Sequence, residues 1–399
     1  MNMRTIILAL ALFLAALAAT ALGCSSSEST AMPDDPLVEG PITGPFGPFV
    51  AGTLGIQLSD VGFEEVELFI SGTAPSYTNL GELGTDGRWN VEEADTADLQ
   101  TRILVYRPLE ARALSGPVVA EWLTVRGGLA AAPVWCSMHT EIFREGHAWV
   151  GVSAQIVGIE GREGGIGNLY LKAVRPERYA PLSHPGDSFS YEMFAQAAQA
   201  VRNPVGIAPL GELDVERVIA VGESQSAGRL ITYVNALGPK YGVFDGYVIH
   251  SRGGGSAPLA QSPQDAVETP DIVQVRDDLN QPTLMFQTES DLFLLNALPS
   301  NQPDSRMFRL WEVAGTAHGD VYTLVTSNTD LGDDPSVAEV VEVSETAGGV
   351  IECEKPINSG PAHWVLKAGL HGLVDWITTG TPLPEAERLA VTEERDAFE

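Results

Sequence analysis

The stretch from Val218 to Leu230 constrains the fold of this chain more than any other. Residues 218–221 are apolar and mostly β-branched, which is typical of a short buried strand. They run directly into Gly222-Glu223-Ser224-Gln225-Ser226, and an apolar helical stretch, residues 229–237, follows. A serine on a sharp turn between a strand and a helix is the local structure of a nucleophile elbow. The sequence therefore predicts that Ser224 is a nucleophile whose hydroxyl projects above the edge of a sheet.

The same stretch admits a second frame. Ser226 stands where the usual elbow pattern has a second glycine, and residues 224–228 also read as small-x-Ser-x-Gly, with Ser226 as the nucleophile. The apolar run stops at Gly222, however, so the elbow begins there. This position favours Ser224.

The composition is typical of a globular enzyme and not of a coiled coil or a disordered chain. Of 399 residues, 44% are hydrophobic, and 41 Gly and 26 Pro suit a loop-rich α/β domain. The net charge of −30 repels phosphate backbones, so nucleic acid is not an expected partner. There is no H-E-x-x-H motif, no Walker loop and no strand followed by G-x-G-x-x-G, so neither a metal nor an organic cofactor is expected.

The N-terminus reads as a targeting segment. Residues 6–22 are almost purely apolar, end in small residues and lead into Gly23-Cys24-Ser25. This pattern resembles a bacterial lipoprotein signal peptide over residues 1–23, with Cys24 as the lipidated N-terminus; the alternative is a simple signal peptide cut near Gly23. A Ser- and Pro-rich flexible tether is expected over residues 24–45 and a single catalytic domain over residues 46–399. The protein is then exported and anchored to the cell envelope by its lipid.

The body of the chain alternates short strand-like runs with helical patterns. This order predicts a mostly parallel sheet of roughly eight strands with helices on both faces and no large separate cap domain. An early strand over residues 66–70 is expected to end in a turn at Ser71-Gly72, and two early strands suit an antiparallel start. Residues 253–279 and 320–361 are long connections, expected to be lids or pocket walls. Cys136 and Cys353 could form a disulfide or remain buried thiols.

A serine nucleophile needs a base and an acid that orients the base, in the chain order Ser, acid, His. Residues 282–287 form a strand that runs into Thr288-Glu289-Ser290-Asp291, where the acid belongs. Asp291 is favoured, because the loop needs a few residues to turn back, and Glu289 is the alternative. His318, in a small-residue loop after the strand over residues 307–313, is the predicted base. The other histidines precede the acid or lie on the last helix.

The tetrahedral oxyanion of acyl transfer needs two backbone N–H donors. One is expected at Gln225, directly after the nucleophile, and the second in the loop near Val125.

These motifs together resemble the α/β-hydrolase superfamily and, more narrowly, the bacterial "alpha/beta hydrolase domain" group of secreted serine hydrolases. The resemblance covers about residues 50–380, and Thr124 stands where many relatives have Asn. It implies the hydrolase fold and serine chemistry but no substrate. The matching phrases are Glu65-Val66-Glu67-Leu68-Phe69-Ile70-Ser71-Gly72-Thr73-Ala74, Glu121-Trp122-Leu123, residues 182–191, residues 222–226, residues 288–291 and residues 315–320.

We therefore expect an exported serine hydrolase that cleaves a small-molecule carboxylic ester through an acyl-enzyme. Ser224 attacks, His318 takes and returns its proton, and Asp291 holds the imidazole. A peptidase, an amidase or an acyltransferase with the same triad is the alternative within enzymes. A catalytically silent surface binding protein of the same fold is the alternative outside them.

Overall fold

The computed structural model describes residues 31–398, except residues 54, 111–115, 166, 334–344 and 348–350. The predicted signal peptide, the predicted lipidation site Cys24 and the start of the predicted tether lie outside the described residues. Among the helices of the described part, none is long and apolar enough to cross a membrane.

A ten-stranded sheet forms the centre of the described residues, and its order is β10-β9-β8-β7-β4-β5-β3-β2-β1-β6. Neighbouring strands from β10 to β5 are parallel, whereas β5-β3, β3-β2 and β2-β1 pair antiparallel. Eight strands have five or more residues, as predicted, and β1 and β6 are short additions at one edge. The bounds are β1 (Leu37–Glu39), β2 (Phe63–Asn79), β3 (Val91–Pro108), β4 (Val118–Trp122), β5 (Ala148–Val152), β6 (Val205–Gly206), β7 (Val218–Glu223), β8 (Gly246–His250), β9 (Thr283–Thr288) and β10 (Phe308–Val313).

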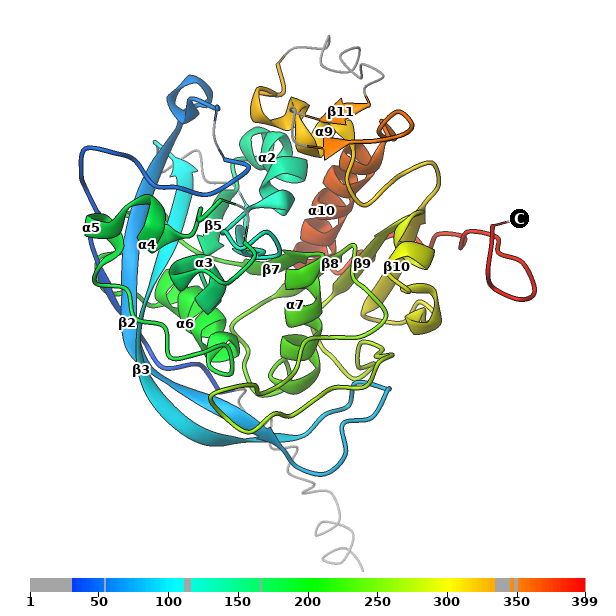
Figure 1. Ribbon diagram of the computed structural model, residues 1–399, viewed down its shortest axis with the longest axis horizontal. Coiled ribbons are helices and arrows are strands. Elements are labelled where there is room, and N and C mark those ends of the chain that lie inside the picture. The colour runs from blue at the N-terminus through cyan, green and yellow to red at the C-terminus, as the bar shows by residue number, and fades with distance from the viewer. Residues whose placement is uncertain are drawn as a thin grey trace, which may run out of the picture. The chain divides into compact units, whose positions relative to one another are not determined.

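Helices cover both faces of this sheet (Figure 1). The pair α6 (Ser190–Arg202) and α7 (Gln225–Ala236) packs on one face, and α2 (Pro133–Glu145) and α10 (Ala362–Thr379) pack on the other. Among the described residues no separate cap domain interrupts this order. The short helices are α3 (Ile156–Glu160), α4 (Leu171–Val174), α5 (Pro176–Tyr179), α8 (Asp291–Leu294) and α9 (Val321–Leu324), with 3-10 turns at Leu58–Val61, Leu298–Ser300 and Thr326–Asn328 and a two-stranded ribbon of β11 (Thr346–Ala347) and β12 (Ile351–Glu352).

Burial on both faces explains why the parallel strands are apolar throughout. In β4, Val118 and Ala120 contribute to the core beneath α6 and α7, while Val119 faces the core beneath α2 and α10. Every residue of β4, β5, β7, β8 and β9 is buried. Strands buried on both faces lose the polar alternation of a half-exposed sheet.

Two predictions for the N-terminal part are wrong. The predicted tether is too long, because Leu37–Glu39 pairs with β2 and Val38 is buried in the core. The predicted turn at Ser71-Gly72 is absent, because β2 continues to Asn79 and Gly72 pairs with Leu99 of β3. A strand this long is stabilised by pairing with its neighbour along its whole length, which local turn residues do not reveal.

The remaining predictions concern the long connections and the two cysteines. Residues 253–279 contain no regular helix or strand, and the buried Arg252 anchors them by donating to the backbone oxygens of Val273 and Gly255. Cys136 and Cys353 are both free thiols, so they form no disulfide with each other. Whether the two long connections act as lids stays a prediction.

Candidate active site

Ser224 occupies the sharp turn between β7 and α7. Its backbone has φ 54° and ψ −113°, a conformation that is strained for a residue with a side chain. A Cβ on Gly222 would lie 3.0 Å from the backbone oxygen of Ser226, so any larger residue would push apart the strand and the helix where they pass each other. The backbone N–H of Ser224 donates to the oxygen of His250 on β8 at 3.0 Å. The local geometry is that of the predicted elbow.

Ser226, the alternative nucleophile, points into the turn. Its hydroxyl donates to the backbone oxygen of Glu223 at 2.9 Å and accepts from the N–H of the same residue at 3.0 Å. The side chain is fully buried. Serine therefore replaces the usual glycine here as a small residue that closes the turn.

The structure brings Ser224, His318 and Asp291 together. Ser224 Oγ lies 2.9 Å from His318 Nε2, and His318 Nδ1 lies 2.8 Å from Asp291 Oδ1. The backbone also fixes the acid and the base, since Thr288 N–H donates to Asp291 Oδ2 and His318 N–H donates to Ser290 Oγ, both at 2.8 Å. Asp291 is fully buried, whereas the His318 side chain is 26% exposed. A buried acid, an accessible base and a serine in hydrogen-bond contact can perform nucleophilic acyl transfer.

The alternative acid, Glu289, lies elsewhere in this loop. Its Oε2 accepts from the backbone N–H of Gly315 at 2.7 Å. It therefore stabilises the loop that carries His318. Among the described residues, Glu289 makes no hydrogen bond to the imidazole. Of the two predicted acids, the structure places Asp291 against His318.

The electrostatics of the three residues suit proton transfer. Burial acts to lower the pKa of His318, but the hydrogen bond to Asp291 and the charge of Glu223 outweigh it, so the pKa lies above its ordinary value. Burial acts to raise the pKa of Asp291, yet the hydrogen bond and the charge of His318 keep it below its ordinary value. Asp291 is thus ionised wherever His318 can act as a base.

The two predicted oxyanion donors lie close to each other. Val125 N–H donates to the side-chain Oε1 of Gln225 at 3.3 Å, and Thr124 Oγ1 lies 3.4 Å from the same oxygen. Gln225 is the first residue of α7, where backbone N–H groups lack an intrahelical acceptor and the helix dipole favours negative charge. The Val125 N–H is therefore engaged by the Gln225 side chain in this structure.

Sequence reasoning missed the role of two buried glutamates. Glu121, on β4, accepts from the N–H groups of Val134 and Trp135 at 3.0 and 2.8 Å and so caps α2, which has no side-chain cap of its own. Burial raises the pKa of Glu121 to about 8. Glu223 lies beside the nucleophile with its carboxylate toward His318. The available signal was an ionisable residue inside each otherwise apolar phrase, Glu121-Trp122-Leu123 and Gly222-Glu223-Ser224.

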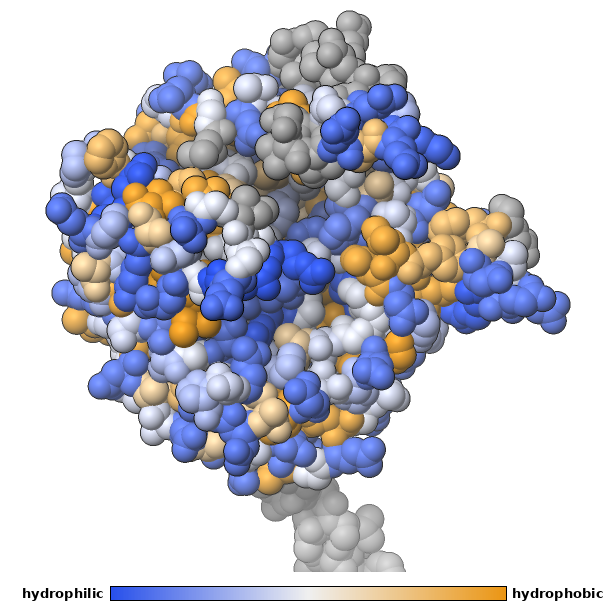
Figure 2. All heavy atoms as spheres, viewed as in Figure 1, coloured by the Kyte–Doolittle hydropathy of each residue, from blue (hydrophilic) through white to orange (hydrophobic). Residues whose placement is uncertain are grey.

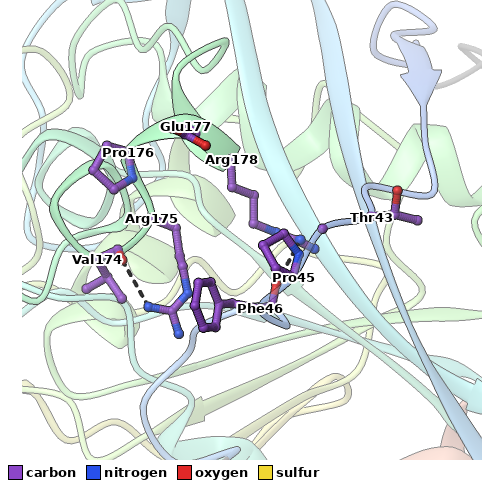
Figure 3. A pocket seen from close by; sticks show the side chains of 9 residues that line it. Thr43, Pro45, Phe46, Val174, Arg175, Pro176, Glu177 and Arg178 are labelled. Carbon is purple, nitrogen blue, oxygen red and sulfur yellow. Dashed lines mark hydrogen bonds between the residues drawn. The ribbon is translucent and has the colours of Figure 1, made fainter.

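The molecular surface is hollowed near the centre of the face in Figure 2, around the region where Figure 1 labels β7 and α7. A separate pocket of about 570 Å³ lies between residues 43–46 and 174–178, and none of the predicted site residues is among its described lining (Figure 3). Within it, the guanidinium of Arg175 stacks on the ring of Phe46 at 4.8 Å. The wall of this pocket comes partly from the segment that was predicted to be a free tether.

A mostly parallel sheet, helices on both faces and a strand–serine–helix elbow define an α/β hydrolase. The chain belongs to the family described as the alpha/beta hydrolase domain, whose family model matches residues 38–399. No curated protein matches the sequence.

Similar solved structures include several esterases. A mutant of the esterase rPPE has 13% identity over 73% of this chain and 83% of its own, with a TM-score of 0.37. A thermostable esterase from Pseudomonas putida has 14% identity over 72% and 82%, with a TM-score of 0.35. An esterase from Pyrobaculum calidifontis has 14% identity over 71% and 87%, with a TM-score of 0.33. Values this low carry no information about the substrate of this chain.

Proposed function

We propose that this hydrolase cleaves a carboxylic ester through an acyl-enzyme on Ser224. The observation that carries the proposal is the continuous chain of contacts from Ser224 Oγ through His318 to Asp291, at 2.9 and 2.8 Å. His318 Nε2 accepts the serine proton while Oγ attacks the ester carbonyl. The imidazolium then returns the proton to the leaving alcohol, and a water molecule, activated by the same nitrogen, releases the acid.

The start of α7 supplies the electrostatic part of this mechanism. The negative oxygen of the tetrahedral intermediate is stabilised by the N–H of Gln225 and by the N–H of Val125. Because the Gln225 side-chain oxygen holds the Val125 donor at 3.3 Å, that side chain must rotate when the substrate carbonyl enters. The N-terminal dipole of the helix favours the same charge.

The test combines labelling with turnover. The purified full-length chain is treated with a fluorophosphonate probe, and the modified peptide is located by mass spectrometry. We expect one adduct, on Ser224, that is lost in Ser224→Ala, together with hydrolysis of members of an ester panel of graded acyl length. Turnover of peptides or amides, or transfer of the acyl group to an alcohol, would replace the ester assignment while keeping the triad. A folded chain with no adduct and no turnover would instead favour a binding protein.

We also propose export and lipid attachment at Cys24, as the sequence of residues 1–27 suggests. Metabolic labelling with a radioactive fatty acid in a bacterial host tests this. The label should enter the wild-type chain and be absent from Cys24→Ala. Incorporation into Cys24→Ala, or cleavage without label near Gly23, would overturn the lipid anchor.

A further inference from the structure

Glu223 carries a second carboxylate to the catalytic histidine. It is the last residue of β7 and precedes Ser224 directly. Its Oε1 lies 3.5 Å from His318 Nε2, the same nitrogen that lies 2.9 Å from Ser224 Oγ. The Glu223 side chain is only 9% exposed. The imidazole therefore meets a carboxylate at each of its two nitrogens.

Among the groups around Glu223 and His318, the protonated imidazole of His318 is the cation that Glu223 can stabilise. Burial lowers the pKa of His250, the register partner of Glu223 on β8, to about 4, so that ring is neutral. The charged or titratable groups that surround Glu223 and His318 are Asp291 on α8, Glu121 on β4, Cys136 on α2, His250 on β8 and the exposed Arg126 after β4, together with Asp320 before α9 and His363 on α10, which line the small cavity beside the pair. Asp291 faces the opposite nitrogen, Glu121 serves the start of α2, and the thiol of Cys136 donates to the backbone oxygen of Gly52.

We propose that ionised Glu223 stabilises the imidazolium form of His318 at the nitrogen that carries the proton taken from Ser224. As the bond between Oγ and the carbonyl carbon forms, the O–H bond of Ser224 breaks and its proton moves to Nε2. Positive charge then develops between two carboxylates, Asp291 at Nδ1 and Glu223 beside Nε2. When the leaving-group bond breaks, the same proton passes to the leaving oxygen. Glu223 gains and loses no proton in these steps.

Burial makes the charge of Glu223 depend on pH near neutrality. Burial raises the pKa of Glu223 to about 7, while the charge of His318 lowers it and that of Asp291 raises it. We therefore expect Glu223 and His318 to titrate as a unit, in two steps that belong to both groups. A cavity of about 20 Å³ borders both side chains and has room for about one water molecule, which can solvate the carboxylate.

The sign of the effect follows from this coupling. A negative charge beside the imidazole raises the pH at which the ring loses its proton, so Glu223→Gln lowers that pH. In Glu223→Gln, the acidic limb of the pH profile of kcat/KM therefore moves to lower pH. The plateau at high pH falls about tenfold to a hundredfold, because the imidazolium of the transition state loses one of its carboxylates. A residue that only supports the fold would lower activity without moving the limb.

The experiment follows the His318 ring directly by NMR, using the purified full-length chain with histidine labelled at Cε1. The signal is assigned by its loss in His318→Ala. We expect a two-step titration of His318 in the wild type and a single step about one pH unit lower in Glu223→Gln. Glu121→Gln is the matched control: it removes a buried carboxylate that does not touch the imidazole and should leave the His318 titration within a few tenths of a pH unit of the wild type. Glu223→Asp keeps the charge and should restore most of the shift, whereas Glu223→Ala, which also removes the charge, serves as the test if Glu223→Gln does not fold.

An unchanged or higher titration midpoint of His318 in Glu223→Gln would overturn the proposal. So would an equal shift in Glu121→Gln. The inference rests on the proposed function for its catalytic meaning, but the two fail separately. A wild-type chain without probe labelling would sink the serine hydrolase assignment, while the NMR titration would still show whether Glu223 sets the charge of His318.

Discussion

Two buried networks of charged groups occupy the two halves of the sheet and behave differently. In the antiparallel half, Glu67 of β2 pairs with Arg102 of β3 at 3.4 Å and accepts from Arg178 at 2.6 Å and from the hydroxyl of Tyr179 at 2.8 Å. In the parallel half, Asp291 and His318 hold Ser224. We call the first network closed, because its charged groups are buried and paired with one another. We call the second network open, because its base, His318, is partly exposed.

The difference shows how burial can serve stability in one place and chemistry in another. The side chains of Glu67 and Arg102 are 1% and 0% exposed, and Arg102 also donates to the backbone oxygen of Phe49 and to Ser153 Oγ. Buried opposite charges that are fully paired and hydrogen-bonded stay ionised and exchange no proton with each other. His318 instead has one nitrogen hydrogen-bonded to Asp291 and the other facing the Ser224 hydroxyl, and its side chain is 26% exposed. The open network differs from the closed one in that one of its groups, His318, can be reached from solvent.

The largest difference is expected when the acid of the open network is changed. Asp291→Asn keeps the shape but removes the charge that orients and stabilises the imidazolium, so kcat should fall about 10⁴-fold. Glu289→Gln, two residues earlier, keeps an oxygen acceptor for the Gly315 N–H and should change kcat only a few-fold. The rate of fluorophosphonate labelling measures both variants even before a substrate is known. A larger loss in Glu289→Gln would reverse the assignment of the acid.

Changing the closed network should affect stability and leave the chemistry intact. Arg102→Met leaves Glu67 buried with one cation fewer, at a cost of about 3 kcal/mol in the free energy of unfolding. Arg107→Met is the matched control on the same strand, since its ion pair with Glu64 is partly exposed and should contribute less than about 1 kcal/mol. Urea unfolding followed by circular dichroism measures both. Equal losses in the two variants, or a shifted pH profile of Arg102→Met, would contradict the division between the networks.

The same division describes what the sequence could predict. The parallel half was predictable because its strands are continuous apolar runs and its candidate catalytic residues follow strand ends in a fixed order. Ser224 and His318 were identified on that basis, and the structure places them in contact. The choice of Asp291 over Glu289 depended on how the loop turns, which spacing alone only favours.

The antiparallel half was less predictable, because long-range pairing decides it. Gly72 reads as a turn residue, yet β3 pairs with β2 on both sides of it. Leu37–Glu39 lies in a segment rich in Pro, Asp and Gly, and only its partner β2 makes it a strand. The partners of Arg102 and Glu223 come from distant parts of the chain, so these two sets of contacts could not be predicted from local patterns. The structure adds the contacts that spacing cannot encode.

The smallest expected effect concerns backbone strain, which the open network contains and the closed one lacks. Ser224 has a positive φ, whereas Glu67, Arg102, Arg178 and Tyr179 do not. Glycine tolerates the backbone angles of position 224 better than alanine does, so Ser224→Gly should be more stable than Ser224→Ala by about 1 kcal/mol, even though glycine raises the entropy of the unfolded chain.

Position 226 provides the control for this comparison, because it lies in the regular first turn of α7. There the order should invert, with Ser226→Ala more stable than Ser226→Gly by about 0.5 to 1 kcal/mol. At each position the Ala and Gly variants lose the same hydroxyl. The difference between their free energies of unfolding therefore reports the backbone preference of that position alone. Urea unfolding midpoints at constant slope measure the four variants. If glycine were the less stable choice at both positions, the elbow would hold its nucleophile without strain, and the open network would differ from the closed one only in its exposed base.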